Sequence, residues 1–134
     1  MAYSLICVLG DNVSVNSVIF DFKNVYDKWA SSIVEWKGNG GSITDCAFIG
    51  NKAEYGGAIT WKGNNGIIED CLFANDTARI AAGAIFITGI NNTIRNALII
   101  NCSSAMTGEA IFIDSKRRNL TMENVYSDNE TLIF

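Results

Sequence analysis

The chain contains no proline and no histidine, and it has no run of 18 apolar residues that could cross a membrane. Without proline, every backbone N–H can join a continuous strand ladder. Without histidine or a C-x-x-C spacing, the four cysteines provide neither a Cys–His nucleophile nor a common zinc site. The net charge of −4 argues against a nucleic-acid partner. We therefore expect no metal, no cofactor, no nucleic-acid partner and no membrane insertion.

A helical hydrophobic period is also missing, and a unit of roughly 25 residues repeats along the chain instead. Its clearest copies are Ser42–Trp61 and Ile67–Ile87. A third copy comprises Thr93–Asn101 and Gly108–Ile113. Self-similarity at this period predicts a solenoid, because one such unit cannot bury its apolar side chains until neighbouring units stack on it.

Within each unit, apolar positions alternate with more polar ones, which is typical of a strand with one buried face. Aligning the copies on their cysteines gives two apolar columns. Phe20 lies in the cysteine column, and Ser17 lies in the column three residues earlier. The first column contains Phe20, Cys46, Cys71, Ala97 and Val125, and the second contains Ser17, Ile43, Ile68, Ile94 and Met122. We expect Cys46 and Cys71 to be buried and unbridged, since stacked parallel side chains rarely reach disulfide torsions.

A row of polar residues directly precedes the cysteine column: Asp45, Asp70, Asn96 and Asn124. Aspartate and asparagine tolerate left-handed backbone, so this row predicts a stacked polar ladder at a sharp bend between two strands. The alternative is that Asp45 and Asp70 form an acid pair for calcium binding or acid–base chemistry, as in the β-helical pectate lyases and polygalacturonases. The asparagines that continue the row favour the turn ladder.

The last strand of each unit is apolar at both parities, at 32–36, 57–61, 83–87 and 109–113. We expect the isoleucines and Trp36 and Trp61 to point inward. Phe86 and Phe112 then stack outside as a candidate partner surface, with the alanines of the strand beside them: Ala58, Ala84 and Ala110. The alternative is that the loops at 52–55, 76–82 and 103–107 fold over this face and bury it.

These patterns predict an all-β chain that forms a right-handed parallel β-helix of about four to five coils. We expect residues 1–134 to form a single domain. Residues 1–12 would be an N-terminal strand or cap, because no basic residue precedes the apolar run at Leu5 that could make it a signal peptide. Residues 13–129 would hold the repeats, and residues 130–134 a truncated terminal coil.

Two short motifs carry a family resemblance. Gly56–Gly57–Ala58–Ile59, with relaxed copies at 82–85 and 108–111, resembles the GGA[I/L/V] motif of polymorphic outer-membrane proteins, and Phe48–Ile49–Gly50–Asn51 is similar to their FxxN motif. The pattern is also similar to adhesin-like surface proteins of methanogenic archaea and to right-handed β-helix repeat proteins. The resemblance covers about residues 13–129 and implies an extracellular or cell-surface protein.

We therefore expect a structural or adhesive surface module that is not an enzyme, with no catalytic residues. It would be a β-helical rod that presents loops and a flat face to a surface carbohydrate or a protein. A carbohydrate-active β-helix, either a polysaccharide lyase or glycoside hydrolase or a sugar-binding protein, is the first alternative. A repeat module that self-associates through its coil ends is the second, because an open coil exposes strand edges.

Overall fold

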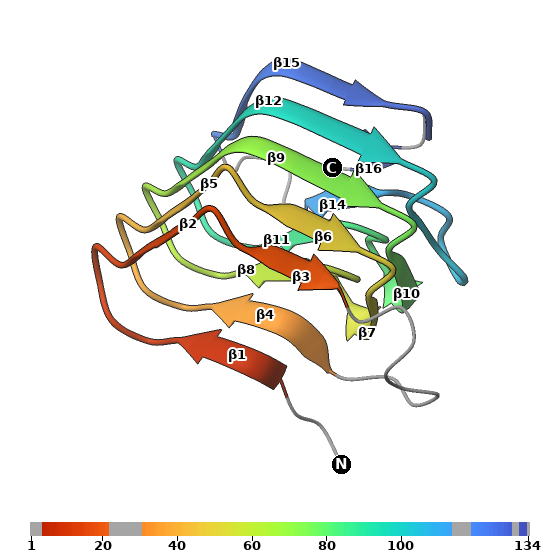
Figure 1. The fold of residues 1–134 in the computed structure, drawn as a ribbon, viewed down its shortest axis with the longest axis horizontal. Coiled ribbons are helices and arrows are strands. Elements are labelled where there is room, and N and C mark those ends of the chain that lie inside the picture. The colour runs from red at the N-terminus through yellow and green to blue at the C-terminus, as the bar shows by residue number, and fades with distance from the viewer. Residues whose placement is uncertain (1–3, 22–30, 114–118, 130–131, 134) are drawn as a thin grey trace.

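The computed structural model describes residues 4–21, 31–113, 119–129 and 132–133 of the chain, so residues 130–131 and 134 of the expected terminal coil lie outside the described residues. All regular elements in these ranges are β-strands, and they stack in parallel as a β-solenoid of about 4 turns (Figure 1). The predicted all-β parallel solenoid is therefore confirmed. No helix in the described part of the chain has the length and apolar character that a membrane crossing requires.

One coil shows how the chain winds. β5 (Ser42–Thr44) leads through a bend into β6 (Ala47–Ile49), a tight turn then gives β7 (Lys52–Tyr55), and a second turn leads back along β8 (Ile59–Trp61). The segment between β6 and β8 was expected to be a loop, and it forms a short strand instead.

Successive coils pair strand on strand, which produces three parallel sheets (Figure 1). The six-stranded sheet contains β1 (Ser4–Val8), β4 (Ser32–Trp36), β8, β11 (Ile85–Ile87), β14 (Ile111–Ile113) and β16 (Leu132–Ile133). The three-stranded sheet contains β7, β10 (Thr77–Ala81) and β13 (Ser103–Ser104). The bent seven-stranded sheet contains β2 (Ser14–Asn16), β3 (Ile19–Asp21), β5, β6, β9 (Ile67–Ala74), β12 (Thr93–Ile100) and β15 (Thr121–Ser127).

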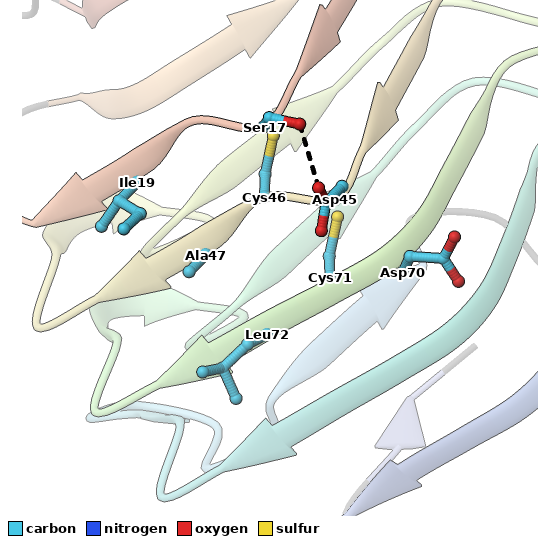
Figure 2. Close-up of a pocket in the computed structure, with 8 residues that line it drawn as sticks. All are labelled: Ser17, Ile19, Asp45, Cys46, Ala47, Asp70, Cys71 and Leu72. Carbon is cyan, nitrogen blue, oxygen red and sulfur yellow. Dashed lines mark hydrogen bonds between the residues drawn. The ribbon is translucent and has the colours of Figure 1, made fainter.

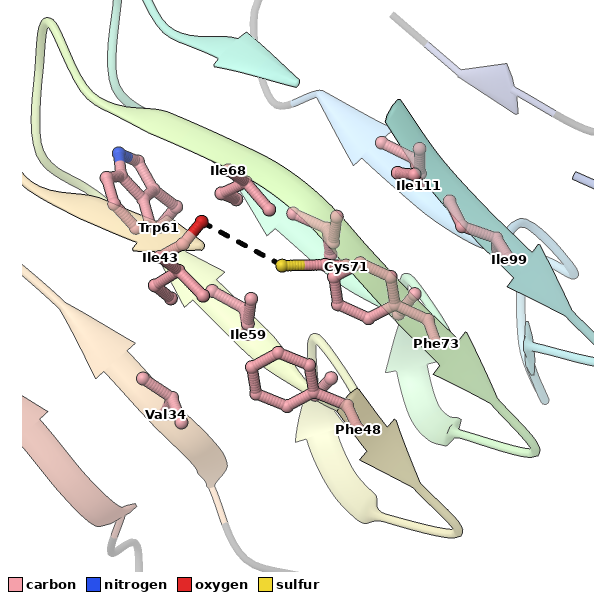
Figure 3. Packing of buried hydrophobic residues seen from close by; sticks show 14 of the residues in the cluster. Val34, Ile43, Phe48, Ile59, Trp61, Ile68, Cys71, Phe73, Ile99 and Ile111 are labelled. Carbon is pink, nitrogen blue, oxygen red and sulfur yellow. Dashed lines mark hydrogen bonds between the residues drawn. The ribbon is translucent and has the colours of Figure 1, made fainter. Parts of the chain in front are cut away.

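The core lies between these sheets and consists of like residues stacked on like. Phe48 stacks on Phe20 at 4.7 Å and on Phe73 at 5.0 Å between ring centroids, and Trp36 stacks on Trp61 at 4.7 Å. Figure 3 shows part of this packing, with Ile59 next to Phe48 and Ile111 next to Ile99. Burying each large apolar side chain contributes about 1.5–3 kcal/mol. The inward direction expected for the isoleucines and tryptophans is confirmed.

The expected register of the first copy is wrong by two residues. Phe20 pairs with Phe48, not with Cys46, and Ser17 lies in the row of Asp45, with its N–H bonded to the Thr44 carbonyl in the next coil. The first coil is longer, since 28 residues separate Phe20 from Phe48 against 25 between Phe48 and Phe73. Stacking of the aromatic rings sets this register.

The expected outward direction of the alanines in the six-stranded sheet is also wrong. Ala58, Ala84 and Ala110 are buried in the core beside the isoleucines that follow them. The N–H groups of Ala84 and Ile85 both donate to the carbonyl of Ala110, at 2.8 and 3.2 Å, which breaks the alternation at this corner. Two consecutive side chains can therefore both face the interior.

Candidate functional site

The polar row at the bend of the seven-stranded sheet is a stacked ladder with left-handed backbone. Ser17, Asp45, Asp70, Asn96 and Asn124 have φ angles of 59°, 54°, 56°, 52° and 53°. The Asn124 amide donates to Asn96 Oδ1 at 2.9 Å, the Asn96 amide donates to Asp70 Oδ1 at 3.1 Å, and the Ser17 hydroxyl donates to Asp45 Oδ2 at 2.9 Å. These contacts explain the row as a ladder that stabilises the bend of the chain. Ser17 belongs to this ladder, although the sequence alignment assigned it to another column.

Asp45 and Asp70 border a shallow hollow of about 510 Å³ (Figure 2). No lysine or arginine among the described residues forms an ion pair with either carboxylate. Arg95 forms ion pairs with Glu69 at 3.0 Å and with Glu123 at 2.9 Å on the outer face of the sheet. The described residues hold no group of three or more His, Cys, Asp or Glu side chains that could bind a metal ion.

The second candidate is the aromatic column, which we define as Phe86 and Phe112 with Tyr55 beside them. The Phe86 and Phe112 rings stack outside the six-stranded sheet, with centroids 5.0 Å apart and planes within 10°. Both residues are half-buried. Tyr55, on β7, meets Phe86 edge-on at 5.3 Å. In the alternative interpretation, segments 52–55, 76–82 and 103–107 were loops that bury this face; the strands β7, β10 and β13 within them form the three-stranded sheet, and the column stays half-buried.

The aromatic stack ends at Thr60, which pairs with Phe86 in the register of β8 and β11. Because threonine is small, a pocket of about 240 Å³ opens beside Phe86, and its lining is Ser32, Glu35, Tyr55, Thr60, Lys62 and Phe86. Here a ring face meets hydroxyl groups and a charged pair. The pocket therefore offers a ligand a mainly apolar surface next to the partly exposed Glu35–Lys62 pair.

The polar groups of this pocket are oriented by their own hydrogen bonds. The Thr60 hydroxyl donates to the Tyr55 carbonyl at 3.2 Å and lies 2.7 Å from the Ser32 hydroxyl. If Thr60 donates to Tyr55, Ser32 donates to Thr60, and because both residues are buried these bonds fix the inner wall of the pocket. The Lys62 ammonium donates to Glu35 at 2.8 Å, and this bond lowers the pKa of Glu35 below its usual value of 4.5.

A third surface was missed by the sequence analysis, and we call it the apolar face. It lies on the outer surface of the seven-stranded sheet beyond the bend, and Figure 2 shows Ile19, Ala47 and Leu72 in a row there. Ile19, Tyr126 and Leu98 expose 71%, 58% and 44% of their surface. The face comprises Ile19, Ala47, Leu72, Leu98 and Tyr126 in one column and Ile49, Ala74 and Ile100 in the next, where the exposed Asp21 pairs with Ile49 at one end. Both parities are apolar in β6 and in β9 and β12 beyond the bend, and that signal was available in the sequence.

Three of the four cysteines are buried and offer no reactive thiol, whereas Cys7 is exposed, with its Sγ 3.6 Å from Glu35 Oε1. Cys46 and Cys71 are buried and free, as expected, and burial raises the pKa of Cys71 to about 11. Burial also raises the pKa of Cys102 to about 12. A thiol with such a pKa is protonated at neutral pH and is a poor nucleophile.

Comparisons of the chain with models of known protein families, with curated proteins and with solved structures give no match. The functional argument therefore depends on the three surfaces themselves.

Proposed function

We propose that the chain is a non-catalytic binding module of the cell surface or extracellular space, in which a stiff β-solenoid presents the aromatic column to a ligand. The pocket where the aromatic stack ends carries this proposal. One ring face of Phe86 borders it, and the rigid six-stranded sheet holds the column in place. The resemblance of the Gly56–Ile59 motif to polymorphic outer-membrane proteins, and of the repeat to methanogen adhesin-like proteins, is consistent with this role.

A sugar ring is the ligand that this pocket suits best. Its C–H groups can pack on the Phe86 ring, while its hydroxyls can accept from Lys62 and donate to Glu35. An aromatic or aliphatic side chain of a protein would use only the apolar part of this surface, because it has no group to bond with the Lys62–Glu35 pair. The volume of about 240 Å³ lies below the roughly 300–1,000 Å³ of pockets for drug-sized ligands, so we propose one sugar unit in the pocket.

A glycan array probed with the labelled chain tests this proposal. We expect a limited set of glycans to bind, and we expect Phe86→Ala to abolish that binding because it removes the ring face. Leu98→Ser, which changes an exposed residue on a different sheet, is the matched control and should leave binding intact. Absence of any bound glycan, or equal binding by Phe86→Ala, would contradict the proposal.

A carbohydrate-active enzyme is the second candidate, and the observation in its favour is the hollow bordered by Asp45 and Asp70. Its test is incubation with polygalacturonate and measurement of new reducing ends or unsaturated products. The binding-module proposal expects no turnover. Sustained turnover that is lost in Asp70→Asn would replace it with the enzyme.

A further inference from the structure

The apolar face is independent of the proposed sugar pocket, because it lies on the seven-stranded sheet and the pocket lies on the six-stranded sheet. Its strands bury Phe20, Phe48 and Phe73 on the inside while they present mainly isoleucine, leucine and alanine to the outside, with Asp21 at the end of β3. Strands that are apolar on both faces normally lie between two packed layers. An exposed contiguous apolar surface of this kind marks an interaction site.

The size of the apolar face selects among possible occupants. Five paired strands at about 4.8 Å spacing make it about 20–25 Å long, and three residues along each strand make it about 10 Å wide. Such a face offers about 200–250 Å², whereas a stable protein interface buries about 800 Å² on each partner. A face of this size suits a short segment bound with modest affinity, and a second copy would also bring its own net charge of −4 to the contact.

An α-helix matches the same dimensions. Its diameter with side chains is about 10–12 Å, and a length of 20–25 Å corresponds to about 14–16 residues at a rise of 1.5 Å per residue. A helix laid along the face would cross all five strands and bury one apolar stripe against them.

The charges along the border of the face specify the flanks of that helix. The carboxylates of Asp45 and Asp70 share one hollow with Ala47 and Leu72, and both aspartates are exposed (Figure 2). Each accepts a hydrogen bond from a neutral group, and neither has a basic partner within the described ranges. Lysine or arginine on the flank of a docked helix would meet these carboxylates.

We propose that the apolar face is a docking site for an amphipathic α-helix of a partner protein, with an apolar stripe of about 14–16 residues and basic residues on its flank. The apolar columns of Leu72 and Leu98 hold the stripe, and Asp45 and Asp70 pair with the basic flank. The sugar pocket has no part in this contact.

Fluorescence anisotropy with three labelled peptides of about 16 residues tests the proposal. The first is a helical peptide with leucines on one side and lysines on the flanks, the second carries glutamate in place of lysine, and the third is a scrambled version of the first without an apolar stripe. We expect the first peptide alone to bind, and Leu98→Ser to weaken it by about tenfold or more. Phe112→Ser, on the other sheet, is the control and should not change the affinity.

The charge contribution is tested with Asp45→Asn combined with Asp70→Asn. Asparagine already occupies this row at Asn96 and Asn124 with the same left-handed backbone, so the double variant keeps the bend. It should bind the lysine peptide more weakly and with a smaller dependence on salt. Equal binding of the scrambled or glutamate peptide would overturn the proposal. So would a concentration-dependent dimer in sedimentation equilibrium that Leu98→Ser abolishes, because a second copy would then be the occupant.

Discussion

Trp36 and Trp61 stack on each other in the core, yet their indole N–H groups have different environments. Trp61 Nε1 donates to Asn92 Oδ1 at 3.1 Å, whereas Trp36 Nε1 is buried with no partner among the described residues. The position that corresponds to Asn92 one coil earlier is Gly66, which has no side chain to accept a bond. A Cβ atom there would lie 2.2 Å from the Trp61 ring, so the tryptophan excludes it.

We predict that Asn92→Ala lowers the free energy of unfolding by about 1–3 kcal/mol, because it leaves the Trp61 N–H buried without an acceptor. Asn92 also accepts from the Gly66 N–H at 2.7 Å and donates to the Gly63 carbonyl at 2.9 Å. Urea denaturation followed by tryptophan fluorescence measures the change. Thr121→Ala, at an exposed position, is the control and should stay within about 0.5 kcal/mol of the parent.

Asp76 is a buried carboxyl group at a turn of the coil. Its Oδ1 accepts from the Asn51 N–H at 2.9 Å, and Cys102 Sγ lies 3.8 Å from its Oδ2. Burial raises the pKa of Asp76 from 3.8 to about 8, so the folded chain holds this proton at neutral pH while the unfolded chain releases it. The free energy of unfolding therefore falls as the pH rises from about 4 to about 8, by up to about 1.4 kcal/mol per pH unit.

We predict that Asp76→Asn removes this pH dependence and makes the protein more stable than the parent at pH 9, with the difference shrinking as the pH falls toward 5. The amide keeps the carbonyl acceptor for Asn51 and carries no charge to desolvate. Denaturant titrations across this pH range measure the effect, and Asp70→Asn should retain the slope because Asp76 is unchanged. A parent whose stability does not fall with rising pH would contradict the prediction.

At the scale of elements, the bend ladder of the seven-stranded sheet carries its hydrogen bonds in one direction. Each asparagine amide donates to the residue one coil before it, from Asn124 to Asn96 and from Asn96 to Asp70. The series stops at Asp70, since an ionised carboxylate has no donor for Asp45. Asp45 instead accepts a hydrogen bond from the Ser17 hydroxyl in the preceding coil.

We predict that Asp70→Asn stabilises the fold by about 0.5–1.5 kcal/mol, because its amide can donate to Asp45 and complete the ladder. Asp70→Ala should instead destabilise it by about 1–2 kcal/mol, since alanine pays the steric cost of a φ near 56° and offers Asn96 no acceptor. Thermal and denaturant unfolding of the two variants distinguish the effects. Destabilisation by both to the same extent would contradict the ladder argument.

The Gly56–Ile59 motif also has an element-scale explanation. A Cβ atom on Gly57 would lie 2.0 Å from the carbonyl oxygen of Gly83, so the backbone of one coil packs directly on the next at this corner. In the third copy the position is Glu109, whose carboxylate accepts from the Ala82 N–H at 2.8 Å. The motif residues therefore serve coil stacking, and the resemblance that they carry concerns the fold.

At the scale of the whole molecule, each coil packs only against its neighbours, so stability follows position along the solenoid. Phe48 and Phe73, in the middle coils, are fully buried, whereas Val15 and Met122, in the outer coils of this chain, are only partly buried. The central part of the seven-stranded sheet therefore has more buried apolar surface to lose on opening.

We predict that amide hydrogen exchange is slowest in β6 and β9 and faster in β2 and β15. Mass spectrometry of peptides from the exchanged native chain measures the difference. Uniform protection along the chain would contradict the prediction, because it would mean that all coils open in a single cooperative step.

The repeat and its alternation were sufficient to predict the parallel solenoid, the stacked coils and the inward Ile59, Trp36 and Trp61. These features depend on local chemistry, since a unit of this length with one apolar side has to stack on its neighbours. The candidate partner residues Phe86 and Phe112 could be named for the same reason, because they depart from the alternation expected of a half-buried strand.

The tertiary structure decided what depends on connection length and on which faces meet. The 28-residue spacing from Phe20 to Phe48 moved Ser17 into the polar ladder, and the double donation to the Ala110 carbonyl turned the alanines inward. The tertiary structure also placed Thr60 beside Phe86, which opens the pocket, and it left Leu98 exposed on the apolar face. Alternation in the sequence defines two faces of a strand, but only the packing of the sheets determines which of those faces remains open to a partner.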